Sequence, residues 1–420
     1  MLKSFTTALL LTAALTAPAF AQTMLIKDAN VAMSSGVQSG TDVLIVDGRI
    51  DNIATNITAP NGAQIIDAVG QWVTSGVVSP FSRLGLVDIG GEDDTNDITA
   101  GDAPTSVSER AADSFNPRAV AIANTRRRGI THALISPDAS DDSIFSGTGS
   151  IINLSGDFDS IKTEAAFVHV VLGETGARRA GGSRAAAMTQ IRSALADAKA
   201  YRTRYNAPTD GDALPRRDAL ALVPVVNGYM PLMVTVNRAI DILNVIKLKK
   251  QYDLDIIILG AAEGWQVADQ LAAANMKVII DPHDNLPVNF EAVESRLDNV
   301  VWLDAAGVDY AIANISTLGV QKASAITQHA GNAVGNGLSW DKAFKAISET
   351  PAKWFGLDNA SLAVGGIANL VVWDGDPLLV TSAPTHMVLD GETQSLESRQ
   401  TALRDRYFPL SKDTRPHKYR

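Results

Sequence analysis

Residues 73–86 read VTSGVVSPFSRLGL, and this stretch decides the fold that the sequence predicts. Its first half is an apolar run around Val73, Val77 and Val78, which is typical of a buried strand. Its second half, residues 80–85, is typical of the loop that leaves such a strand. In barrels of parallel strands, the loops at the C-terminal strand ends carry the chemistry. We therefore expect Phe81 and Arg83 at the mouth of a barrel.

Apolar runs alternate with helical patterns along the chain that follows. The strand-like runs are residues 130–137, 165–173, 231–237, 255–261, 276–282 and 308–314. Strands that alternate with helices predict parallel pairing, and near-continuous apolar runs fit strands buried on both faces. The sequence therefore predicts an α/β fold, a (β/α)8 TIM-type barrel formed by residues 73–357.

The opening stretch resembles the first barrel strand of the amidohydrolase superfamily, in which an apolar lead and Pro-Gly precede His-x-His and Leu-Gly. Here Gly76, Leu84 and Gly85 are in register. Three further segments resemble the family: PLMVTVNRA at 231–239, TPAKWFGL at 350–357 and VGGIANLVV at 364–372. The chain is thus identified as an imidazolonepropionase-like member of an exported branch. The resemblance implies a composite β-sandwich formed by residues 22–72 plus 358–397, and it leaves residues 398–420 as a polar tail.

The same resemblance implies one or two divalent metals held by His-x-His on the first strand, Lys or an acid on the fourth, His on the fifth and sixth, and Asp on the eighth. Other residues stand at the positions that can be placed here: Phe81, Arg83, Thr235, Leu259 and Ile315, or its neighbour Asn314. A fixed cation at Arg83 would repel a metal, since two unit charges about 4 Å apart cost roughly 4 kcal/mol at an effective dielectric constant near 20. We therefore predict a degenerate site with no metal and no cofactor.

Other polar residues also fall at the predicted strand ends and form a candidate pocket: Asn237, Arg238, Glu263, Asp281 and His283. Asp281 and His283 could act as an acid/base pair, although a polar loop is the ordinary explanation. The acidic residues 88–109 are expected as a solvated loop over the mouth, with a calcium site as the alternative.

A second candidate is an anion or carboxylate site at the start of a helix, formed by Gly181, Gly182, Ser183 and Arg184. A solvated basic turn would explain the same residues. We expect His132 to be a buried, hydrogen-bonded strand residue, and we assign structural or solvated roles to the remaining histidines, His169, His329, His386 and His417.

The N-terminus predicts export. Lys3, the apolar residues 8–15 and Ala19-Phe20-Ala21 together form a signal peptide, residues 1–21, with cleavage after Ala21. The predicted location is therefore periplasmic or secreted, with no membrane insertion after cleavage. The chain has no cysteine, which excludes disulfides and thiolate metal sites. A net charge of −10 argues against a nucleic-acid partner.

Two main functional hypotheses remain open. One is an exported homologue that binds a small ligand or a partner without metal chemistry. The alternative is an active hydrolase of amides or cyclic amides with a relocated or metal-independent site. A subunit that pairs with a related amidohydrolase, or a homo-oligomer, is also possible.

Overall fold

The computed structural model describes residues 23–101, 103, 105–205, 212–287, 289–315, 323–357 and 361–408. The predicted signal peptide, residues 1–21, lies outside these ranges, as do the last twelve residues. In the described part of the chain, no helix combines the length and apolarity needed to cross a bilayer.

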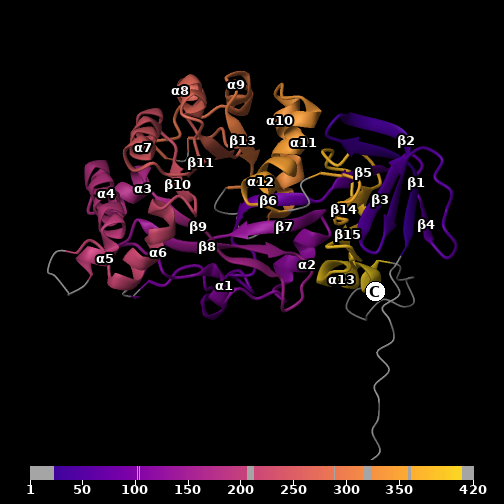
Figure 1. Ribbon diagram of the computed structural model, residues 1–420, viewed down its shortest axis with the longest axis horizontal. Coiled ribbons are helices and arrows are strands. Elements are labelled where there is room, and N and C mark those ends of the chain that lie inside the picture. Colours follow the sequence, from indigo (N-terminus) through magenta and orange to yellow (C-terminus); the bar gives the residue numbers. More distant parts are fainter. Residues whose placement is uncertain are drawn as a thin grey trace, which may run out of the picture.

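A barrel-like sheet forms the centre of the molecule (Figure 1). Its described strands pair in the order β13-β12-β11-β10-β9-β8-β7-β6. Their bounds are β6 Val77–Ser82, β7 Ile130–Ile135, β8 Phe145–Asn153, β9 Ile161–Val171, β10 Leu232–Val236, β11 Ile256–Gly260, β12 Lys277–Ile280 and β13 Asp309–Ile312. The two end strands β6 and β13 contact each other but share no ladder pairing within the described ranges, so the barrel is nearly closed. The predicted TIM-type α/β barrel is therefore confirmed as a nearly closed, eight-stranded sheet.

One strand departs from the predicted all-parallel (β/α)8 pattern. Strand β8 runs antiparallel to both of its neighbours, β7 and β9, whereas the other pairs in this sheet are parallel. Only short loops join β7 to β8 and β8 to β9, and a parallel connection needs a crossover of a dozen or more residues. The expectation of a helix between every two strands is therefore wrong at β8.

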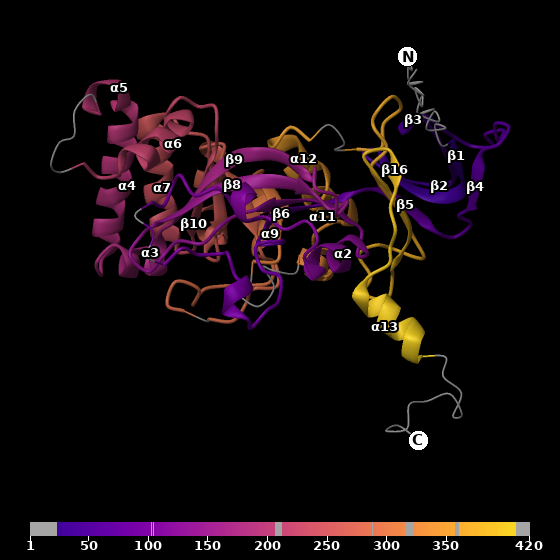
Figure 2. The ribbon, with the colours of Figure 1, turned by 90° about the horizontal axis from the view of Figure 1, so that it is seen from below.

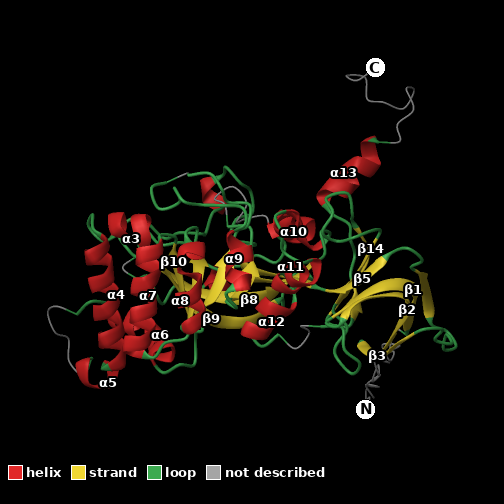
Figure 3. Ribbon diagram, turned by 90° about the horizontal axis from the view of Figure 1, so that it is seen from above, coloured by secondary structure: helices red, strands yellow, loops and turns green. Residues whose placement is uncertain are grey.

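Helices cover the outside of this sheet (Figure 3). Their bounds are α1 Ala111–Ser114, α2 Val120–Arg126, α3 Gly173–Arg179, α4 Arg184–Lys199, α5 Tyr201–Arg204, α6 Arg216–Val226, α7 Ala239–Tyr252, α8 Ala268–Ala273, α9 Asn299–Ala305, α10 Ile326–Gly335, α11 Trp340–Ala346, α12 Glu349–Trp354 and α13 Arg399–Tyr407. The 3₁₀ turns in the described ranges are η1 Asp93–Thr95, η2 Gly264–Val267 and η3 Ala323–Ala325.

Both ends of the chain contribute to a second sheet, which lies at one side of the barrel (Figures 1 and 2). Its order is β16-β15-β14-β5-β1-β2-β3, with β4 paired to β1. The bounds are β1 Met24–Met33, β2 Gly36–Val46, β3 Arg49–Ala54, β4 Gln64–Asp67, β5 Trp72–Ser75, β14 Leu370–Trp373, β15 Pro384–Leu389 and β16 Glu392–Thr393. The composite origin is therefore observed. Pairing places all these strands in one sheet, and its division into the two layers of a sandwich stays a prediction.

The stretch 73–86 divides between the two sheets at Gly76. Strand β5 pairs with β14 of the terminal sheet, and β6 begins the barrel one residue later. The terminal sheet therefore extends to Ser75, beyond the expected boundary at residue 72. Strand β6 also continues to Ser82, so that Phe81 is a strand residue and not part of a loop.

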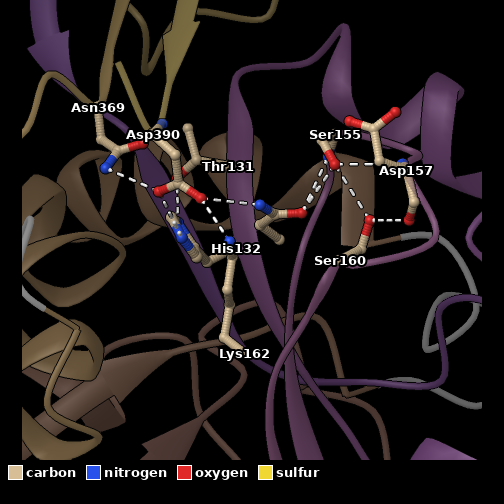
Figure 4. A network of polar contacts seen from close by, with 9 residues as sticks. Thr131, His132, Ser155, Asp157, Ser160, Lys162, Asn369 and Asp390 are labelled. Atoms are coloured by element: carbon tan, nitrogen blue, oxygen red, sulfur yellow. Dashed lines mark hydrogen bonds and ion pairs between the residues drawn. The ribbon is translucent and has the colours of Figure 1, made fainter. Parts of the chain in front are cut away.

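A polar network joins the two sheets at the N-terminal side of the barrel strands (Figure 4). Asp390 lies in the β15–β16 turn, and its carboxylate accepts hydrogen bonds from Lys162 Nζ and Asn153 Nδ2, each at 2.8 Å. The Nε2 atom of His132 lies 3.8 Å from the same carboxylate, and its Nδ1 is 3.1 Å from the Thr131 hydroxyl. His132 is buried, as expected.

The C-terminal segment is more ordered than the predicted polar tail. Helix α13 begins with a capping box in which Ser398 and Thr401 exchange hydrogen bonds. This Ser-x-x-Thr spacing is visible in the sequence. No helix was predicted here because the segment lacks apolar residues that recur every three or four positions. The described part of the tail therefore forms a helix, while residues 409–420 lie outside the described residues.

Candidate functional site at the barrel mouth

An ion-pair cluster lies at the C-terminal ends of β6 and β7. The Arg83 guanidinium is 2.7 Å from Asp138 Oδ2, and Arg179 Nη1 is 3.5 Å from Asp138 Oδ1. Burial would raise the pKa of the Asp138 carboxyl, but Arg83 and Arg179 outweigh burial and hold that pKa below its usual range. Asp138 is therefore ionised, and two cations share it.

His169 lies beside this cluster, on β9. Its Nδ1 is 2.9 Å from the Ser136 hydroxyl, and its Nε2 is 2.8 Å from Thr235 Oγ1 on β10. Burial lowers the pKa of His169 to about 4, and the nearby Arg83 also lowers it, against the opposing charge of Asp138. The imidazole is therefore neutral at pH 7, and both ring nitrogens have partners.

Phe81 closes the cluster from the β6 side. Its ring meets the His169 ring edge-on, with centroids 5.4 Å apart, and only 3% of the residue is exposed. Phe81 and Leu259 belong to the apolar cluster that fills the barrel interior, and Ile315 packs against it. The structure thus brings together the five positions that the sequence marks as degenerate.

This group of side chains does not fit a divalent metal. Phe81, Leu259 and Ile315 offer no side-chain ligand atom, and the Arg83 guanidinium is a donor without an acceptor. Asp138 is already neutralised, and His169 has both nitrogens engaged. Within the described ranges, no three His, Asp or Glu side chains are grouped as metal ligands.

A second polar pair lies at the end of β12. Asp281 Oδ1 is 2.7 Å from His329 Nδ1 on α10 and also accepts the backbone N–H of His283, while Oδ2 accepts the N–H of Ile315. Burial opposes ionisation of Asp281, but these contacts, led by His329, lower its pKa. No described residue hydrogen bonds to His329 Nε2.

The structure corrects the expected partner of Asp281. His283 contributes only its backbone N–H, and its exposed ring lies 5.4 Å from the His329 ring, centroid to centroid. The imidazole that hydrogen bonds to Asp281 is that of His329, and this contact is compatible with the structural role expected for His329.

The other members of the candidate pocket form the joint between β10 and α7. Glu263 Oε2 accepts the N–H of Ala239 at 2.9 Å, at the positive end of α7, and Arg238 pairs with Asp241 at 3.1 Å. Asn237 Nδ2 donates to the buried Glu291 at 3.3 Å. Among the described residues, no hydrogen bond or ion pair connects this group to Asp281 or His283. These contacts give Asn237, Arg238 and Glu263 partners within the protein, and their place in a ligand pocket stays a prediction.

The predicted anion-binding turn is largely engaged by the protein itself. Ser183 caps α4 by accepting the N–H of Ala186 at 3.1 Å. Arg184 lies 3.0 Å from Asp241 and 3.7 Å from Glu291. Gly181 and Gly182 adopt positive φ values of 92° and 106°, which a tight turn requires. The Arg184 charge is thus balanced by two carboxylates.

The sequence did not point to Asp138 or Glu291 as members of these clusters. It also gave no sign that His329 would hydrogen bond to Asp281. Asp138 follows β7 in the run Ser-Pro-Asp, which is typical of a turn. Its position after a predicted strand was the one available signal. His329 is 48 residues from Asp281, and no spacing rule connects them.

Comparisons with known proteins agree with this architecture. Residues 223–401 match the Amidohydrolase family. The matched region covers somewhat under half of the chain. It includes the family-like positions Thr235, Leu259 and Ile315, whereas Phe81, Arg83 and Asp138 precede it. No curated protein matches the chain in sequence.

Solved structures extend the likeness to most of the chain. An amidohydrolase from Thermotoga maritima MSB8 superposes with a TM-score of 0.77 at 24% identity, covering 88% of this chain and 99% of that one. Molinate hydrolase gives 0.54 at 16% identity, with 90% and 95% covered, and a prolidase complexed with N-methylphosphonate-L-proline gives 0.56 at 15% identity, with 89% and 99% covered. At these identities the likeness establishes the fold, and function must be argued from the site.

Proposed function

We propose that the whole chain is an amidohydrolase-superfamily protein of hydrolase ancestry whose barrel mouth binds a small ligand without a divalent metal. The Arg83–Asp138 ion pair carries this proposal, because it occupies a position that the family resemblance assigns to a metal ligand. Phe81, Thr235 and Leu259 complete the replacement with apolar contacts and a hydrogen bond to His169.

The charge at the mouth suggests the ligand class. Two guanidinium groups share one carboxylate, and the Nε atoms of both Arg83 and Arg179 are buried without a hydrogen-bond partner in the described part of the chain. Guanidinium groups bind carboxylates well, since their donors match the carboxylate geometry. The hydrolases that share this fold act on amide-like bonds in several cases, which favours a ligand such as an N-acyl amino acid.

Thermal-shift measurements on residues 22–420 test this proposal. We expect N-acetylated amino acids at about 10 mM to raise the melting temperature equally with and without EDTA, because a ligand that binds only the folded state stabilises it. Arg83→Met should abolish the shift, whereas Arg118→Met, at an exposed arginine, should retain it. A ligand-induced shift that requires added zinc and disappears with EDTA would contradict the proposal, as would the absence of any shift.

The Asp281–His329 pair favours a second candidate, a metal-independent hydrolase of amides or cyclic amides. An Asp that orients one imidazole nitrogen leaves the other free to act as a general base, and such a base contributes about 10²–10⁴-fold to a rate. A panel of cyclic amides and dipeptides should then be hydrolysed in the presence of EDTA. His329→Gln should remove this activity by a similar factor, and His283→Gln should not. Absence of hydrolysis by the wild-type chain eliminates this candidate.

We also propose that the protein is exported and acts in the periplasm or outside the cell, as the signal-like residues 1–21 suggest. Intact-mass analysis of protein produced with its N-terminus would then find a chain that begins at Gln22. Pairing with a related amidohydrolase, or self-association, is the proposed form of any assembly, and light scattering of the purified protein would distinguish the two.

A further inference from the structure

A surface hollow of about 530 Å³ lies between the loop after β6, helix α2 and the start of α13. Its lining includes Asp88, Asn124, Arg127, Arg128, Arg399 and Gln400. None of the residues of the barrel-mouth clusters lines it. Helices α2 and α13 are far apart in the sequence but lie near each other at this edge of the molecule (Figure 2).

Three arginines line this hollow, and their charge is only partly balanced. No described residue forms an ion pair or side-chain hydrogen bond with Arg127, Arg128 or Arg399. The one acid among the described lining residues, Asp88, accepts hydrogen bonds from Asn116 at 2.9 and 3.0 Å. This local excess of positive charge contrasts with the net charge of −10 of the whole chain.

The packing of α13 brings these cations closer together. Burial lowers the pKa of Arg127, and repulsion from Arg128 and from Arg404 on α13 lowers it further, against a smaller attraction from Asp405. Arg399 is the first residue of α13, where a cation opposes the helix dipole. The repulsion between the arginines and the position of Arg399 at the N-terminus of α13 are both unfavourable. A bound anion would weaken the repulsion and would interact favourably with the helix dipole.

We propose that this hollow binds a small polyanion with two or more carboxylate or phosphate groups, and that the bound anion fixes α13 against α2. Arginine favours both groups because its planar donors bind their oxygens in pairs. Residues 409–420 are a poor alternative occupant, because they carry four basic side chains and one acidic one.

Calorimetric titration of residues 22–420 with citrate and with pyrophosphate at low ionic strength tests the site. We expect at least one of them to bind with a Kd below about 1 mM, and the affinity to fall with added salt. Binding of citrate alone would assign the site to hydroxy-carboxylates, and binding of pyrophosphate alone would assign it to phosphates. The double variant Arg128→Ala/Arg399→Ala should weaken binding by about tenfold or more, since charge-assisted hydrogen bonds are lost. Arg118→Ala is the matched control.

Hydrogen exchange provides the second readout. The anion should slow exchange of the α13 amides in the wild-type chain and leave those of the double variant unchanged. The proposal fails if neither anion binds, if the double variant binds as well as the wild type, or if binding leaves α13 exchange unaltered. Arg83→Met should retain anion binding here, which separates this site from the function proposed for the barrel mouth.

Discussion

Asp138 is the residue on which the barrel-mouth cluster depends, because it is the shared partner of two guanidinium groups. Asp138→Asn would leave both cations partly buried without a counter-ion. We expect it to lower the free energy of unfolding by about 3 kcal/mol, as in other proteins in which one partner of a buried pair is removed. Arg179→Met should cost clearly less, since the shorter Arg83 contact survives. Urea denaturation at pH 7 measures both, and equal effects of the two variants would contradict this account.

His169 gives the mouth a dependence on pH. Burial holds its pKa at about 4 in the folded protein, against 6.5 for an unperturbed histidine. Between these values the unfolded chain binds a proton that the folded chain does not. The stabilising contribution is therefore complete above pH 6.5 and is lost as the pH falls toward 4.

His132 has the same low pKa of about 4 because of its burial, so it contributes in the same window. His169→Gln should therefore make the plot of melting temperature against pH less steep between pH 6.5 and 4 and leave part of the slope in place. Parallel plots for the variant and the wild type would show that His169 is not held neutral in the folded state.

The residues of the site were only partly predictable. Family-like motifs fixed the register of the positions expected at the barrel mouth, and the loss of metal ligands at these positions stays a prediction. Asp138 and His329 were missed because their partners lie far away in sequence and meet them only after the barrel closes. The sequence paired Asp281 with the adjacent His283, whereas the imidazole that hydrogen bonds to Asp281 belongs to the distant His329.

Among the secondary-structure elements, the junction between β5 and β6 depends on Gly76, which allows residues 73–86 to contribute strands to both sheets. A Cβ at this position would lie 2.3 Å from Cγ2 and Oγ1 of Thr131, which is buried and donates a hydrogen bond to the Val77 carbonyl. Gly76→Ala should therefore lower stability by about 1–3 kcal/mol through overpacking. Gly101→Ala is the control, because its Cβ would meet nothing within 4 Å and its backbone has no positive φ. Calorimetric unfolding of the two variants compares them, and a neutral Gly76→Ala would contradict the proposed close approach.

The elements that the sequence predicted correctly have strong local patterns. Strands β10 to β13 are short apolar runs between amphipathic helices, and they were placed within a residue or two of their observed bounds. The direction of β8 and the helix α13 escaped because their decisive cues are not local. Strand β8 takes its direction from short connections on both sides, and α13 packs a mainly polar sequence against α2 at the edge of the molecule.

At the scale of the whole molecule, the chain forms two sheets. Segments near both ends of the chain form the terminal sheet, and the segment between them forms the barrel. Residues of both sheets converge on Asp390, and the chain passes between them at Gly76 and again before β14. The family resemblance predicted this interleaving. The exchange of metal ligands for an ion pair and apolar contacts is a separate property, which we propose for the barrel mouth and which the metal analysis below tests.

The metal content of the purified protein tests the central proposal most directly. Residues 22–420 would be incubated with excess zinc or manganese, dialysed, and analysed by inductively coupled plasma mass spectrometry, with a metal-dependent amidohydrolase treated identically as the positive control. The account predicts less than about 0.1 metal ion per chain, because the mouth lacks the several imidazole and carboxylate ligands that hold such ions. About one tightly held ion per chain would contradict it.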